Sequence, residues 1–189
     1  MLPTMIVIAI VVLLVVWAIA IYNRLVRQRA LVKEGFSGIT VQLRRRADLV
    51  PNLVSTVEGY AAHEKGVLTE VTAHRADATN AGSVAATAQA DNAFTGMLGR
   101  LMAVAEAYPD LKASENFQQL QGELTEIEDT LQSARRYYNA TVRDLNSSIQ
   151  SFPNVLFARP LGFSEAEFYA DDDASIQHAP QVKFGAAQG

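Results

Sequence analysis

Residues 32–71 read VKEGFSGITVQLRRRADLVPNLVSTVEGYAAHEKGVLTEV, and the pattern of this stretch decides the fold. In alternating steps of four and three residues, ten of twelve positions are apolar, and the other two are Arg46 and Glu64. This spacing predicts an α-helix that packs lengthwise against other helices, because strict alternation, the signature of a strand, is absent. The twelve positions are Val32, Phe36, Ile39, Leu43, Arg46, Val50, Leu53, Val57, Tyr60, Glu64, Val67 and Val71.

Pro51 lies inside this stretch. Proline removes a backbone donor and clashes with the carbonyl four residues earlier, so a helix normally breaks there. The apolar positions nevertheless keep one phase on both sides of Pro51, which a loop has little reason to preserve. We therefore predict one kinked helix over about 24–76.

The chain before this helix is continuously apolar from Met5 to Tyr22, about the length that crosses a bilayer core. Trp17 and Tyr22 sit toward one end, where interfacial aromatic residues belong. A cleaved signal peptide is the alternative, since residues 18–20 fit the A-x-A cleavage pattern. No basic residue precedes the segment, however, so we predict that residues 1–23 form an uncleaved transmembrane anchor.

Basic residues instead follow the apolar segment. The positive-inside rule then predicts a short N-terminus outside and a C-terminal domain in the cytoplasm. The same cations are candidate contacts for anionic lipid headgroups, and the alternative is that they only stop membrane transfer. These candidates are Arg24, Arg27, Arg29 and Lys33.

Two further helices are predicted, over about 84–108 and 114–152, with Ser114 as the N-cap of the second. The fold class is therefore all-α: a single transmembrane helix that continues into a long antiparallel three-helix cytoplasmic bundle over 24–153. Residues 154–173 are aperiodic and are predicted to pack back onto the bundle. They contain a capping box, Ser164 to Glu167, that predicts a short helix from Glu165 to about Ala170. Residues 174–189 are predicted to be a flexible tail.

Several motifs resemble the LemA family. They are LRRRADLVPNLV at 43–54, YAAHE at 60–64, GRL at 99–101, AEAYPDLKA at 105–113, RRYYN at 135–139, FP at 152–153 and PQVKF at 180–184. The likeness spans Tyr22 to about Phe184. It implies the same membrane arrangement, in the inner membrane of a bacterium. It also implies a link to envelope processes or membrane remodelling, and supplies no catalytic residues.

Polar residues at helix-packing positions are candidate interhelical or subunit contacts. Arg46 and Glu64 are too far apart on one helix to meet, so each needs a partner on another helix or must extend its head to water. Arg135, Tyr138 and Asn139 lie together on the last helix, where an interhelical contact is the more common role than a ligand site.

Signs of catalysis are absent from the sequence. It has no cysteine and three scattered histidines, and it lacks phosphate-loop, dinucleotide and nucleophile-elbow motifs. The acidic residues of the last helix, Glu123, Glu126, Glu128 and Asp129, are expected on exposed faces. The net charge of −4 gives no reason to bind nucleic acid. We expect no enzyme activity, catalytic residue, cofactor or metal.

Surplus apolar residues such as Val54 and Leu68 suggest self-association. The sequence thus predicts a non-enzymatic scaffold, tethered to the lipid bilayer and homo-oligomeric, that organises or remodels membrane or recruits partners. The alternative is an adaptor or regulator of a membrane protease or signalling kinase, with a membrane-protein partner. An unrecognised hydrolase is the third reading.

Overall fold

The computed structural model describes residues 2–61, 63–80 and 82–169. These residues are helical or irregular and contain no strand, as the all-α prediction requires. The elements are α1 (Leu2–Glu58), α2 (Lys65–Asn80), α3 (Val84–Glu106), α4 (Pro109–Lys112), α5 (Glu115–Gln150) and the 3-10 helix η1 (Asn154–Leu156).

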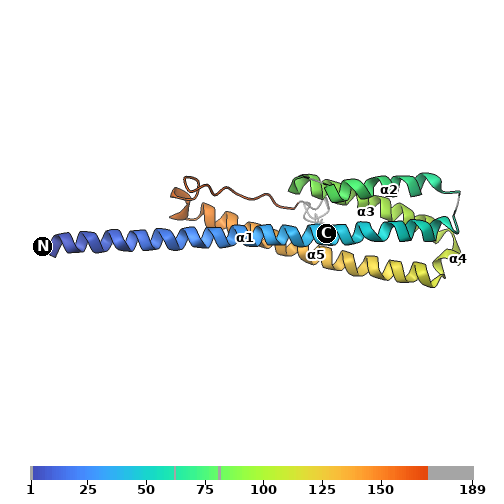
Figure 1. Ribbon diagram of the computed structural model, residues 1–189, viewed down its shortest axis with the longest axis horizontal. Helices are drawn as coiled ribbons and strands as arrows, with labels where there is room; N and C mark the ends of the chain where they lie inside the picture. Colours follow the sequence, from blue (N-terminus) through green and yellow to red (C-terminus); the bar gives the residue numbers. More distant parts are fainter. Residues whose placement is uncertain (1, 62, 81, 170–189) are drawn as a thin grey trace, which may run out of the picture.

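Helix α1 runs along the length of the molecule and organises the other elements (Figure 1). At the end away from the N-terminus the chain turns into α2 and α3, which lie side by side along that half of α1. Helix α5 then returns antiparallel to α1 and packs against it over most of its own length. The distal half therefore contains four long helices, α1, α2, α3 and α5, where three were predicted, and the N-terminal part of α1 extends alone.

The prediction of one helix over 24–76 is wrong at its end. Helix α1 passes through Pro51 as expected but ends at Glu58, and α2 begins at Lys65 after a reversal that starts with a turn at Gly59 and Tyr60. The apolar phase survives this reversal because both helices face one core: Val57 of α1 and Val71 of α2 belong to the same buried cluster. A connection between two helices with a shared core can thus imitate one continuous helix.

The other two helices follow their predicted ranges closely. Ser83 caps α3 by accepting a hydrogen bond from the Ala86 amide at 3.2 Å. Ser114, the predicted N-cap, accepts from the Phe117 amide at 3.4 Å at the start of α5. Each cap satisfies a backbone donor that the first turn of a helix leaves unpaired.

The predicted short helix after Glu165 is also wrong, because residues 163–169 are not helical. The amides and carbonyls of Ala166 and Tyr169 bond instead to the side chains of Asn146 and Asn139 on α5. Phe163 is buried in the core, whereas Phe168 is exposed. Residues 170–189, with the rest of that predicted helix and the predicted tail, lie outside the described residues.

The buried apolar residues form two clusters along the rod. One joins α1 residues 25–43 to α5 residues 131–149 and to Phe163, and the other joins the ends of α1 and α5 to α2 and α3. Val54 and Leu68, expected to be surplus, pack into the second cluster. The large apolar side chains near the N-terminus of α1, from Met5 to Ile19, are exposed, and α1 is long and apolar enough to cross a membrane.

Candidate functional site

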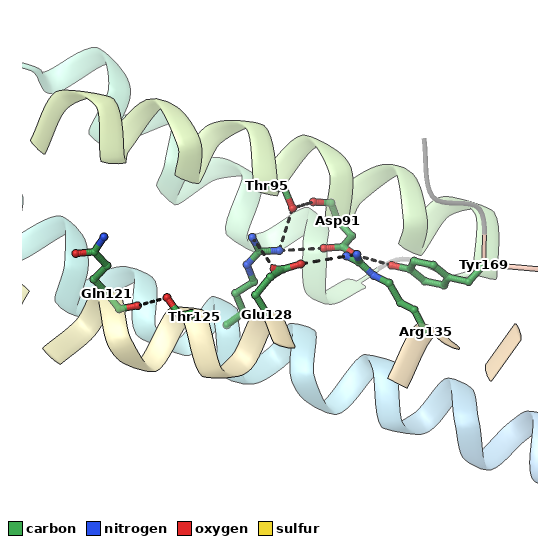
Figure 2. A network of polar contacts seen from close by, with 8 residues as sticks. Asp91, Thr95, Gln121, Thr125, Glu128, Arg135 and Tyr169 are labelled. Atoms are coloured by element: carbon green, nitrogen blue, oxygen red, sulfur yellow. Dashed lines mark hydrogen bonds and ion pairs between the residues drawn. The ribbon is translucent and has the colours of Figure 1, made fainter. Parts of the chain in front are cut away.

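Asp91 of α3 is the centre of a buried polar network between the two apolar clusters (Figure 2). Its side chain has no exposed surface. Arg46 of α1 donates to Asp91 Oδ1 at 3.3 Å, and Arg135 of α5 donates to Oδ2. The Tyr169 hydroxyl donates to the same Oδ2 at 2.7 Å. One carboxylate thus joins α1, α3, α5 and the C-terminal segment.

Glu128 of α5 supplies the second negative charge. Its carboxylate lies 3.1 Å from Arg46 Nη2 and 3.8 Å from Arg135 Nη1. Thr95 completes the pattern: its hydroxyl accepts from Arg46 at 2.9 Å and donates to the backbone carbonyl of Asp91 at 2.9 Å. Two arginines therefore face two carboxylates, and the formal charges balance. Balance matters because an unpaired charge is very costly to bury.

The network shifts the pKa of its members in directions that keep it assembled. Burial, followed by the charge of Asp91 and the hydrogen bond to it, raises the pKa of Tyr169 well above its usual range. Burial alone would lower the pKa of Arg135, but the charge of Asp91 and the hydrogen bond to it outweigh burial and raise it. Tyr169 therefore stays neutral and Arg135 stays charged at physiological pH.

This geometry is suited to locking four elements in register. Both oxygens of Asp91 are occupied and sealed from solvent, so this carboxylate is not presented to a substrate. The arginine planes also cover aromatic rings, Arg46 over Phe94 at 5.6 Å and Arg135 over Tyr169 at 5.6 Å. Each contact fixes one element against another, and a helix shifted along its axis would lose several at once.

A groove of about 410 Å³ opens beside the network, between α3 and α5. Glu128, whose side chain is 29% exposed, reaches it from the network. Gln121 and Thr125, also drawn in Figure 2, lie on the α5 side. Leu98, Met102 and Leu124 make its wall largely apolar. A shallow apolar groove with one acidic edge fits a partner helix better than a small polar substrate.

A second set of polar contacts holds the C-terminal segment on α5. Asn146 accepts from the Ala166 amide at 2.8 Å and donates to its carbonyl at 2.9 Å. Asn139 does the same with Tyr169, at 2.9 and 3.1 Å. Seven residues of helix rise about 10.5 Å, and three residues of extended chain span about 10 Å. The spacing of the two asparagines therefore matches an extended segment of the chain, which they bind at two points.

The predicted contact residues mostly find partners within the chain. Arg46 and Arg135 meet through Asp91, and Asn139 binds the backbone of Tyr169. The Tyr138 hydroxyl donates to the Glu167 carbonyl at 2.7 Å, and burial followed by the charge of Glu167 raises the pKa of Tyr138. Glu64 stands apart from these four: it is half-buried in the connection between α1 and α2, where its carbonyl accepts from the Leu68 amide at 3.4 Å.

The four predicted lipid-contact residues are exposed on α1. Arg24, Arg27 and Lys33 lie on the solvent side of the helix, free of the core clusters. Arg29 differs, because its guanidinium lies 5.0 Å from the centre of the buried Phe163 ring. A cation over an aromatic face is attracted to it, so Arg29 also contributes to holding the C-terminal segment on α1.

Asp91, Glu128 and Tyr169 were missed by sequence reasoning. Glu128 was expected on an exposed face, but it turns inward to the two arginines. The signal for Asp91 was present: steps of four and three through the buried Thr87, Phe94, Leu98, Leu101 and Ala105 of α3 pass through it. The apolar stripe predicted for that helix (Ala90, Phe94, Met97, Leu101, Val104 and Tyr108) shares Phe94 and Leu101 with this pattern but passes through Ala90 in place of Asp91.

Comparison with known proteins agrees with the sequence motifs. The model of the LemA family matches residues 35–184. Magnetosome protein MamQ 2 of Paramagnetospirillum magneticum is 28% identical over 179 residues, which cover 81% of this chain. Magnetosome protein MamQ of Magnetospirillum gryphiswaldense is 26% identical over the same length. The match spans 66% of each of these two relatives. Protein LemA of Metamycoplasma hominis is 26% identical over 79% of this chain and 69% of its own.

Proposed function

This chain belongs to the LemA family, and we propose that it is a membrane-anchored, non-enzymatic helical scaffold that self-assembles and organises or remodels membrane or recruits partners. The observation that carries the proposal is the continuity of α1, a single helix of 57 residues. Its first part has a mean hydropathy of 3.2 over 18 residues with no buried side chain. Its last part is built into the buried clusters.

A continuous helix holds the bundle at a fixed distance from the membrane. At 1.5 Å per residue α1 is about 86 Å long, so a span at its start would hold the network around Asp91 well away from the lipid. We place the N-terminus outside and the bundle in the cytoplasm of a bacterium, at the inner membrane, because the basic residues follow the apolar segment. A rod of this kind is suited to positioning partners at a fixed height above a membrane.

The non-enzymatic part of the proposal is supported by the site. The network is charge-balanced and its central carboxylate is sealed, whereas catalytic carboxylates must reach a substrate. Within residues 2–61, 63–80 and 82–169, no group of acidic or histidine side chains is placed to hold a metal ion. Arg46, Arg135 and Tyr169 are instead used to join α1, α5 and the C-terminal segment to Asp91.

Self-assembly is supported by the middle of α1. Between residues 30 and 42 it carries a shallow groove lined by Ala30, Lys33, Glu34, Ser37, Gly38, Val41 and Gln42. Leu31 and Val41 are exposed there, at 42% and 47%. Small residues beside exposed apolar ones let a second helix approach closely, so we propose that copies of the chain associate through this face.

The test is the mass of the full-length protein, gently extracted in detergent. We expect a discrete oligomer for the unaltered chain and a smaller species for Val41→Asp, with the same helix content. Gln132→Asp is the matched control, because it adds the same charge at an exposed position on α5 and should leave the oligomer unchanged. A monomer for the unaltered chain would contradict self-assembly.

The second candidate function is an adaptor for a membrane protein, and the groove between α3 and α5 favours it. A photo-crosslinking residue at Thr125 would lie in that groove, and one at Val41 in the groove on α1. Cross-links between copies from Val41 support the scaffold. Cross-links to another protein from Thr125, without any between copies from Val41, would replace the scaffold with the adaptor.

A further inference from the structure

The loop that follows α5 exposes an unusual density of large apolar side chains. Phe152 is 81% exposed and Leu156 59%, and three more large apolar residues of the loop are exposed by more than two fifths. The five are Phe152, Val155, Leu156, Phe157 and Leu161. The sequence predicted that this segment would pack back onto the bundle. Ala158, Phe163 and Tyr169 of that segment are buried, but the five large apolar side chains of residues 152–161 are left uncovered by the chain.

The place of the loop along α1 indicates what covers this surface. The Phe157 ring meets the Trp17 ring edge-on, with centroids 6.2 Å apart, and the Phe163 ring meets Tyr22 at 5.6 Å. Trp17 lies within the apolar segment of α1, five residues before its end at Tyr22. At 1.5 Å per residue this is about 7.5 Å inside the end of the segment, the depth at which interfacial helices bury their apolar faces.

We propose that residues 152–161 enter the surface of the lipid bilayer beside α1 and form a second membrane contact. This inference rests on the proposed membrane span, because the span sets the height of the loop. A bilayer edge at Tyr22 would surround Trp17 and Phe157 together. The exposed apolar residues would then be solvated by lipid, and the chain would touch the membrane at two points instead of one.

The backbone of the loop is already prepared for this environment. In lipid, an amide or carbonyl without a partner is costly. The loop is a series of tight turns whose amides bond internally: Val155 to Ser151, Phe157 and Ala158 to Asn154, Leu161 to Phe157, and Phe163 to Ala158, at 2.8–3.0 Å. Gly162 permits the last turn with a φ of 79°. Most of the amide donors of the loop therefore already have a partner within the chain.

Charge is arranged to match a bilayer surface. Arg159 is exposed within the loop, and Arg24 and Arg27 are exposed on the neighbouring turns of α1. Guanidinium groups beside a shallow apolar patch bind the phosphates of anionic headgroups while the patch enters the acyl boundary. A second copy of the chain would offer no reason for apolar residues to gather at the height of the membrane edge.

The chain contains no cysteine, so a single introduced thiol can carry an environment-sensitive dye. Three variants of the full chain, Leu156→Cys, Tyr137→Cys and Val12→Cys, would be labelled and reconstituted in vesicles of phosphatidylcholine and phosphatidylglycerol. Tyr137 is an exposed aromatic residue on α5, beside Gly35 and away from the loop. It is the matched aqueous control, and Val12 reports on the span. Nitroxide-bearing lipid quenches dye in the bilayer, and iodide quenches dye in water.

We expect lipid quenching and little iodide quenching at positions 12 and 156, and the reverse at 137. If 156 behaves like 137 while 12 is quenched by lipid, the span stands and the loop inference is wrong. If 156 is shielded from both quenchers, protein covers the loop and the inference is also wrong. If 12 is quenched by iodide, the proposed span itself fails, and the loop contact fails with it.

Discussion

Asp91 is the residue through which the buried polar network joins its elements. It is fully buried, and it receives donors from α1, α5 and the C-terminal segment. A buried ion pair adds little net stability when complete, because desolvation offsets attraction, but the loss of one partner leaves the others buried and unpaired. The main effect of Asp91 is therefore to make one arrangement of the helices much lower in free energy than its alternatives.

Asp91→Asn should lower the free energy of unfolding by about 3–5 kcal/mol, since two buried guanidinium groups lose their shared counter-charge. Thermal unfolding in detergent, followed by circular dichroism, measures this loss. Asp48→Asn is the matched control: Asp48 pairs with Arg75 at 3.4 Å on the exposed surface, where such a pair contributes at most about 1 kcal/mol. Equal effects of the two substitutions would contradict the central role of Asp91.

The Tyr169 hydroxyl makes a pH-dependent contribution. Its pKa is raised in the folded chain, so folded and unfolded chains both keep the proton below about pH 10, the usual tyrosine value. Above that pH the unfolded chain loses the proton while the folded chain retains it, and this part of the stability falls. Tyr169→Phe should cost about 1.5–3 kcal/mol at neutral pH, and less as the pH rises above about 10.

Unfolding curves of the unaltered chain and of Tyr169→Phe, recorded from neutral to alkaline pH, measure how the difference in their stabilities shrinks. Tyr138 and the lysines titrate in both proteins, so their effects cancel in the difference. A difference that stays constant across the range would mean that the Tyr169 pKa is not raised by folding.

At the scale of elements, the approach of α1 to α5 depends on Gly35. A Cβ atom added at Gly35 would lie 3.1 Å from the Tyr138 Cα, closer than side chains normally pack, whereas one added at Gly38 would meet nothing within 4 Å. The backbone of α5 cannot move away locally without disturbing the Tyr138 and Asn139 contacts next to it.

Gly122→Ala, at an exposed position of α5 where an added Cβ atom would also meet nothing within 4 Å, should stabilise the protein by about 0.5–1 kcal/mol, because alanine loses less backbone entropy than glycine in a helix. Gly35→Ala should destabilise it instead, by about 1 kcal/mol or more, since overpacking exceeds that gain. Melting temperatures of the two variants decide between these outcomes. A rise for both would show that α1 and α5 can separate without loss.

At the scale of the whole molecule, the rod consists of two apolar clusters with the charged network between them. Arg46 lies between the α1 members of the two clusters, and Asp91 between their α3 members. This layer prevents the helices from sliding, because an axial shift would place charges against apolar side chains.

Leu131→Asp should unfold the bundle, because Leu131 is fully buried beside this layer and an unpaired carboxylate there costs more than a typical domain can lose. The helical signal should fall in part only, since the apolar segment of α1 remains helical in detergent. Leu31→Asp, at a position 42% exposed, is the control and should retain the full signal. A cooperative transition unchanged by Leu131→Asp would contradict the packing of α5.

Much of the architecture was readable from the sequence alone. The spacing of apolar residues predicted α5 nearly to its ends, because a helix that buries one stripe must repeat it every turn. It also predicted that α1 passes through Pro51. A charged residue inside the stripe, Arg46, marked a polar contact within the core. The apolar run of residues 5–22 was evident from the order of residues alone.

Other features were decided only by tertiary structure. The chain reverses between Glu58 and Lys65, yet the spacing of apolar residues continues unchanged. This spacing indicates which face of a helix is buried, but not whether the chain has changed direction. The partner of Arg46 could not be read because Asp91 lies 45 residues away, and only the packing of α3 brings it near. The extended segment at 163–169 overrode its own capping signals because Asn139 and Asn146 satisfy its backbone better than one turn of helix would. Local sequence sets which structures are available, and long-range contacts choose among them.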